Sequence, residues 1–261
     1  MTDHVAASLR EANAVSERPG YVGCLRSILP RCPIEPRMTG MSTSIESAVE
    51  PLMHSPLLTE IVETLQSRVR EETVRRRRFY EELRDDQKAE FIDGQVIVHS
   101  PARAKHLTVR QHLERLLGTY VSMRSLGQVH GEKCLCVFPR NDYEPDVVFF
   151  GPEKAAGLAD NTTQFPIPDF VVEILSDSTE DRDRGVKFDD FESHGVAEYW
   201  IIDADAEVVE QYVRSGGHFR MALKSGSGEI ASPTVAGFRI PIRAIFDPAG
   251  NLAALRELMA S

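Results

Sequence analysis

The sequence has no long hydrophobic run. Its longest apolar stretches, VVFF at 147–150 and FVVEIL at 170–175, are far shorter than the roughly 20 residues that a membrane-spanning helix needs. The first 15 residues carry scattered charges and no continuous apolar segment, so no secretory signal is expected. The sequence therefore predicts a cytoplasmic protein with no membrane partner.

Cysteine is also scarce, with four residues in 261. Cys134 and Cys136 are two apart in an apolar stretch, so in a strand both side chains would point to one face. A zinc site needs a second ligand pair at close spacing, and Cys24 and Cys32 belong to a different, loop-like segment. Buried reduced thiols are the preferred interpretation.

The chain lacks a glycine-rich phosphate loop, a nucleophile elbow, a zinc-binding histidine pair and internal repeats. These absences disfavour the common small-molecule enzymes. The content of 42% hydrophobic and 27% charged residues is ordinary for a globular protein with a sizeable core.

Positive charge is in deficit, because the formal net charge is −10. Binding of phosphates depends on local clusters, however, and not on the average. One cluster is the arginine run 75–78, for which a solvated helix face is the favoured interpretation. A second lies within 103–115, where Arg103, Lys105 and Arg110 are the candidate nucleic-acid contacts.

Three regions are expected along the chain. Residues 1–56 are rich in turn formers and predict a flexible N-terminal extension. Residues 57–86 form a helical segment, since apolar residues recur at helical spacing. Residues 87–261 hold the compact domain. Its order of elements predicts an α/β fold, a mixed twisted sheet flanked by helices.

Within this domain, Asp93-Gly94 favours a tight hairpin between two short strands. Helices are expected at 104–124, at 179–193 and from about 250. Strands are expected at 133–138, 145–150, 169–175, 197–203, 209–214 and 218–223.

Two carboxylates stand out at strand positions. Asp146 follows Pro145 at the entrance of an apolar strand, where a turn-forming role is equally compatible with the pattern. Glu173 lies inside FVVEIL, where an unpaired carboxylate would cost several kcal/mol. Neighbouring strands at 145–150 and 169–175 would bring the two acids together, and hard oxygen ligands select Mg²⁺ or Mn²⁺.

The helix that follows can supply a cation. Asp183, Lys187 and Phe191 are spaced four apart and so share one face. If Phe191 packs on the sheet, Lys187 points to the same region as the acids. The simpler interpretation is an exposed Asp–Lys pair on a helix, or a buried ion pair between Glu173 and Lys187.

Together these segments resemble a known family. The resemblance rests on Glu90 in AEFIDG, His106 after SPARAK, PD at 145–146, PDFVVEILSDST at 168–179, Asp183, Lys187 and GVAEYWIID at 195–203. The chain resembles the Uma-type restriction endonuclease family of the PD-(D/E)xK nuclease superfamily over about residues 80–250. Residues 168–203 are the most specific part.

The resemblance implies a restriction-endonuclease-like core and a metal-dependent endonuclease that hydrolyses phosphodiester bonds in nucleic acid, with DNA favoured over RNA and the choice between them left open. It implies that Asp146, Glu173 and Glu90 hold Mg²⁺ or Mn²⁺. The catalytic set would be Asp146, Glu173 and Lys187, with Glu90, His106 and Asp183 in support. A homodimer is a further expectation.

Two positions depart from the family pattern. Leu175 stands where the motif has its lysine, so that Lys187 would supply the basic group from the next helix. Gln95 replaces an acid found in relatives. These departures and the net charge leave open a second function, a non-catalytic module that binds metal or nucleic acid on the same fold.

Overall fold

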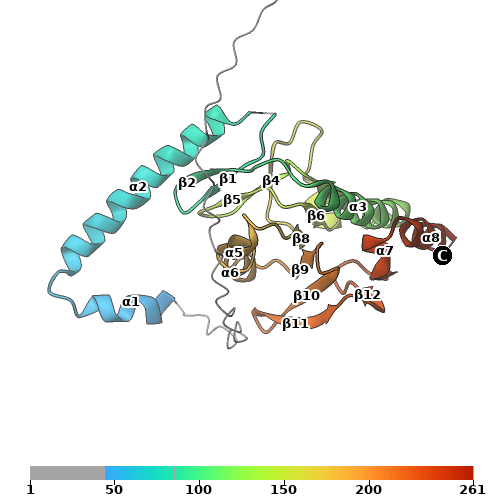
Figure 1. The fold of residues 1–261 in the computed structure, drawn as a ribbon. Helices are drawn as coiled ribbons and strands as arrows, with labels where there is room; N and C mark the ends of the chain where they lie inside the picture. Colours follow the sequence, from blue (N-terminus) through green and yellow to red (C-terminus); the bar gives the residue numbers. More distant parts are fainter. Residues whose placement is uncertain (1–44, 85, 261) are drawn as a thin grey trace, which may run out of the picture. The chain divides into compact units, whose positions relative to one another are not determined.

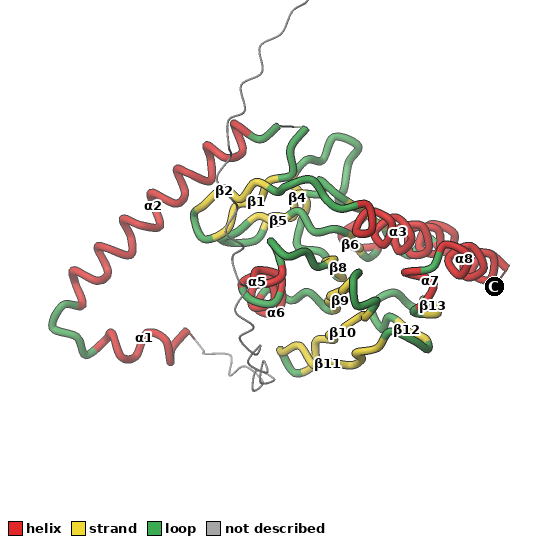
Figure 2. Tube along the Cα trace, viewed as in Figure 1, coloured by secondary structure: helices red, strands yellow, loops and turns green. Residues whose placement is uncertain are grey.

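The computed structural model describes residues 45–84 and 86–260 (Figures 1 and 2). Cys24, Cys32 and most of the expected N-terminal extension lie outside them. No helix in this described part of the chain is both long enough and apolar enough to cross a membrane.

A six-stranded sheet is the centre of the fold. Its order is β11 (His218–Ser225), β10 (Val208–Ser215), β9 (Glu198–Asp203), β8 (Phe170–Ile174), β6 (Val147–Phe150) and β3 (Gln128–Gly131). Only the β8–β9 pair is parallel in this sheet. All of these strands except β3 match those expected from alternating and continuous apolar runs.

A second, five-stranded sheet has the order β2 (Gln95–Val98), β1 (Ala89–Ile92), β5 (Asp142–Tyr143), β4 (Leu135–Val137) and β7 (Gln164–Phe165). The strands β12 (Glu229–Ala231) and β13 (Arg239–Pro241) form a separate pair. The fold is thus mixed α/β as predicted, with three sheets instead of the expected single one.

Eight helices are present in the described residues: α1 (Ile45–Met53), α2 (Leu58–Glu82), α3 (Ala104–Arg124), α4 (Pro152–Ala155), α5 (Glu180–Asp183), α6 (Val186–Ser193), α7 (Arg243–Phe246) and α8 (Pro248–Ala260). Helix α3 has the expected bounds and lies beside α8 (Figure 1).

The six-stranded sheet is covered on both faces. Val147, Phe149 and Val172 pack with α3, α7 and α8 in one hydrophobic cluster. Val148 and Val171 point the other way, into a second cluster that includes residues of the five-stranded sheet and of α6. Burial on both faces explains why β6 and β8 read as continuous apolar runs.

The hairpin between β1 and β2 has the expected turn. Asp93 and Gly94 both have positive φ, 51° and 76°, as a two-residue type I′ turn requires. Cys134 and Cys136 are buried free thiols in the same cluster, as predicted.

The prediction of a single helix at 179–193 is wrong. The chain forms α5 and α6 with a break at Gly185, whose φ of −110° and ψ of −107° are not helical. A Cβ at this position would lie 2.6 Å from the carbonyl oxygen of Asp181. Glycine therefore permits a close turn that the acidic and apolar pattern alone did not reveal.

The arginine run is only partly a solvated helix face. Arg76 donates to both carboxylate oxygens of Asp142 and to the carbonyl oxygens of Phe138, Pro139 and Asn141. Asp142 is fully buried. Arg76 therefore anchors the C-terminal half of α2 to the five-stranded sheet.

A buried carboxylate also ties the α5–α6 link to the large sheet. Glu210 of β10 accepts hydrogen bonds from Arg184, 2.7 Å away, and from Tyr212, and lies 2.8 Å from Lys224. Burial alone would raise the pKa of Glu210, but these partners outweigh it and lower the pKa from 4.5 to about 2.

We expect Glu210→Gln to make stability less dependent on pH. A lowered carboxylate pKa stabilises the fold above about pH 4.5, and this contribution is lost as the pH falls toward 2. The variant should be less stable than wild type by roughly 2 kcal/mol at pH 7, after allowing for solvent screening of the two cations. The difference should shrink by pH 3.5. Urea unfolding at both pH values measures it, and an equal difference would contradict the assignment.

Candidate active site

Asp146 and Glu173 lie on neighbouring strands. In the antiparallel β6–β8 pair, Val147 is opposite Val172, and one further step in this register sets Asp146 opposite Glu173. Directly opposite residues point to the same face of a sheet. Each carboxylate is only 3% exposed. The two acids expected to act together therefore share one face.

Lys187 is the centre of the cluster. Its Nζ lies 2.8 Å from Glu173 Oε1, 2.9 Å from Glu90 Oε1 and 3.2 Å from Asp183 Oδ1. Glu173 belongs to the six-stranded sheet, Glu90 to the five-stranded sheet and Asp183 to α5. One ammonium thus joins acids from both sheets and from the helix between them.

Glu90 is held on both oxygens. The backbone N–H of Glu144 donates to Glu90 Oε1 at 3.0 Å, and His99 Nε2 lies 2.9 Å from Glu90 Oε2. Glu144 in turn accepts a hydrogen bond from the backbone N–H of Ala89 at 3.1 Å.

Asp146 is also held on both oxygens. The backbone N–H of Ile174 donates to Oδ2 at 2.8 Å, which fixes the side chain against β8. Oδ1 lies 2.9 Å from Lys88 Nζ and 3.3 Å from His106 Nε2. His106, at the first turn of α3, therefore touches the cluster directly.

The electrostatics divide the acids into two groups. Burial acts to raise the pKa of Asp146 and of Glu90, but it is outweighed. Lys88 and His106 lower the pKa of Asp146 below its usual range, and Lys187 with His99 lowers the pKa of Glu90 to about 2.

The pKa values of the other acids are raised. Burial raises the pKa of Glu173 well above its usual range, against the effect of Lys187 and with the help of Asp183 and Asp146. Burial likewise raises the pKa of Asp183 and brings that of Glu144 to about 7. Burial acts to lower the pKa of Lys187, but the surrounding acids outweigh it and raise this pKa, so the lysine stays charged.

The donor set fits a divalent cation in charge and chemistry. Four carboxylates, Glu90, Asp146, Glu173 and Asp183, face two lysines, which leaves a surplus of two negative charges when all are ionised. Neither buried oxygen of Asp183 accepts a well-directed hydrogen bond. All the donors are hard oxygens, the kind that Mg²⁺ and Mn²⁺ prefer.

Lysines contact the carboxylates of the cluster directly. Within residues 45–84 and 86–260, no three or more His, Cys, Asp or Glu side chains are arranged to share one ion.

The expected nucleic-acid contacts are all paired with acids. Arg103 lies 2.7 Å from Asp177, and both Arg103 and Lys105 lie near Asp205 at 3.7 and 3.5 Å. These two basic residues are exposed and precede His106 in the chain. Arg110 is half-buried, against Glu114 and Glu132.

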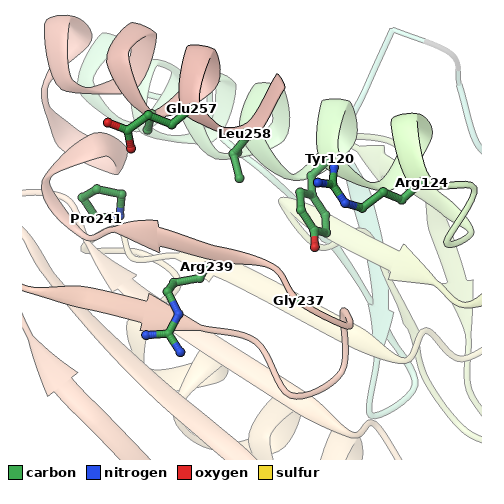
Figure 3. A pocket seen from close by; sticks show the side chains of 8 residues that line it. Tyr120, Arg124, Gly237, Arg239, Pro241, Glu257 and Leu258 are labelled. Carbon is green, nitrogen blue, oxygen red and sulfur yellow. The ribbon is translucent and has the colours of Figure 1, made fainter. Parts of the chain in front are cut away.

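One cavity of the structure lies away from the acidic cluster. A cavity of about 320 Å³ is lined by Tyr120 and Arg124 of α3, by residues around β13 and by α8 (Figure 3). Arg124 lies over the ring of Tyr120, 4.2 Å from its centroid. None of the clustered acids lines it.

Three residues of the cluster were not singled out from the sequence: Lys88, His99 and Glu144. A signal existed for Lys88, because it stands two positions before Glu90 and alternate strand residues share a face. His99 and Glu144 reach Glu90 through the β1–β2 and β1–β5 pairings, which sequence spacing does not show.

The comparisons with known proteins agree with this architecture. One solved structure is described as a putative nuclease belonging to DUF820 from Anabaena variabilis. It is 19% identical, with a TM-score of 0.56 over 64% of this chain and 94% of that chain. This likeness shows the fold. No curated protein matches the sequence.

A family model covers more than half of the chain. The model Uma2, described as "Putative restriction endonuclease", matches residues 76–243, a range that contains all the acids of the cluster as well as Lys88, His106 and Lys187. The chain belongs to the Uma2 family.

Proposed function

We propose that this chain is a metal-dependent endonuclease that hydrolyses phosphodiester bonds in nucleic acid, with DNA preferred to RNA. The family description and the nuclease-like fold support a nuclease. The observation that carries the proposal is that Asp146 and Glu173 lie opposite each other where β6 and β8 pair, in a buried cluster of carboxylates.

Asp146, Glu173 and Glu90 would hold Mg²⁺ or Mn²⁺. The ion would polarise the phosphate and lower the pKa of a water molecule. The chain's own residues fix the geometry: Ile174 N–H orients Asp146, while His99 and the N–H of Glu144 orient Glu90. His106, in contact with Asp146 and partly open to solvent, can pass a proton to or from the reacting groups.

The proposed nuclease is tested by incubating the full chain with supercoiled plasmid and with a structured RNA. With Mg²⁺ or Mn²⁺ we expect nicking of the plasmid, weaker cleavage of the RNA and no cleavage of either in EDTA. Metal binding by calorimetry without cleavage of any substrate would contradict the enzyme.

That outcome would favour the second candidate, a metal- or nucleic-acid-binding module. The observation in its favour is that lysines already contact the carboxylates of the cluster. Homodimer formation stays a prediction.

A further inference from the structure

The two lysines of the acidic cluster have very different surroundings. Lys187 is 1% exposed and contacts three carboxylates. An ammonium group has three N–H donors, and all three acids lie within 3.2 Å of that of Lys187. Because its side chain is almost completely buried, Lys187 has no path to a polymer outside the protein.

Lys88 lies at the edge of the same cluster. It directly precedes β1, and its carbonyl oxygen accepts a hydrogen bond from the N–H of His99 at 3.0 Å, which extends the β1–β2 ladder by one pair. Its side chain is 16% exposed. Among the described residues its Nζ makes a single hydrogen bond, to Asp146 Oδ1 at 2.9 Å. Two of its three donors therefore remain available.

The open side of the cluster is marked by Lys88 and His106. Both approach Asp146 Oδ1, and both side chains are 16% exposed. Lys187, Glu90 and Asp183 are each at most 1% exposed. Among the residues that the structure describes, Lys88 and His106 are therefore the more open contacts of the cluster.

Lys88 and His106 are the basic groups that approach Asp146 at this opening. Arg103 and Lys105, close to His106 in the chain, are exposed but lie near Asp177 and Asp205. A lysine is a compact point charge on a flexible stem that suits contact with a phosphate oxygen.

We propose that Lys88, and not Lys187, is the lysine that contacts the phosphate of bound nucleic acid next to Asp146. Lys187 is a positioning residue that fixes Glu90, Glu173 and Asp183. This inference rests on the proposed function, because it assumes that the polymer that binds at this cluster is a nucleic acid.

The salt dependence of binding tests the assignment. The affinity of the full chain for a fluorescent DNA duplex is measured by anisotropy at several NaCl concentrations, with Ca²⁺ in place of Mg²⁺. Each phosphate contact adds about 0.9 to the slope of log K against log[salt]. Lys88→Gln should therefore reduce the slope by about 0.9, and Lys88→Arg should keep it.

Lys187→Met is the matched comparison. It should lower the melting temperature and leave the slope unchanged. A slope for Lys88→Gln equal to that of wild type, or the same loss of slope in Lys187→Met, would overturn the assignment. Failure of the folded wild type to bind duplex DNA or RNA would overturn it as well.

A measurement on the wild-type chain keeps the test valid if the neutral variants do not fold. An amine-reactive reagent should modify Lys88 faster than Lys187, and bound duplex should protect Lys88. Equal modification of Lys88 with and without duplex contradicts the proposal. Binding and protection without cleavage in Mg²⁺ would contradict the proposed nuclease activity and still support the Lys88 contact.

Discussion

Asp146→Ala is expected to reduce the rate of plasmid nicking roughly 10³-fold, the size of effect that follows loss of one key electrostatic group in an active site. The variant removes one of the two acids that lie opposite each other in the β6–β8 register, on one face of the sheet. It also removes the group that Lys88 and His106 share. Initial rates with Mg²⁺ measure the effect, and circular dichroism checks that the variant folds.

The chain offers a closely matched control. Asp169, like Asp146, follows a proline, stands at the entrance of a buried strand and pairs with a lysine, here Lys154 at 2.6 Å. Its other oxygen accepts a hydrogen bond from the N–H of Gly151. Asp169→Ala should nick plasmid at a rate within a few-fold of wild type. Equal nicking rates of wild type and Asp146→Ala would contradict the assignment of the active site to this cluster.

Lys187→Met is expected to destabilise the fold by about 3–5 kcal/mol, because it removes the cation from a buried ion pair and leaves its partners charged or forces them to take up protons. The methionine has a similar length and keeps the packing beside Tyr143. The midpoint of urea unfolding at pH 7 measures the loss.

Lys154→Met is the control for this change. Lys154 is 33% exposed and pairs with one carboxylate, so its loss should cost about 1 kcal/mol or less. Mg²⁺ should raise the melting temperature of Lys187→Met, since a cation bound by the native state stabilises it by mass action. A stability of Lys187→Met within 1 kcal/mol of wild type would show that the acids do not depend on this lysine.

The sequence was sufficient for the parts of the site that arise from one strand or from two successive ones. Glu173 was recognisable because a carboxylate within an apolar strand requires a partner. The position of Asp146 beside it followed from the expected neighbouring strands, and β6 pairs with β8 as anticipated. The apolar periodicity also predicted the first and last residues of α3 correctly.

The remaining parts depend on packing between distant segments. Glu90 comes from a different sheet, and nothing in its spacing shows that it meets Lys187. Gly185 divides an apparently regular helix because of a close backbone approach. Arg76 stands among similar arginines, and only the position of the buried Asp142 distinguishes it.

The central ammonium of Lys187 has a consequence for the order of assembly. Three of the acids precede residue 183 in the chain, but the cation between them is supplied later, from α6. A nascent chain that ends before α6 therefore holds mutually repelling acids with no central charge to gather them. We therefore expect the centre to form only once synthesis has passed this helix.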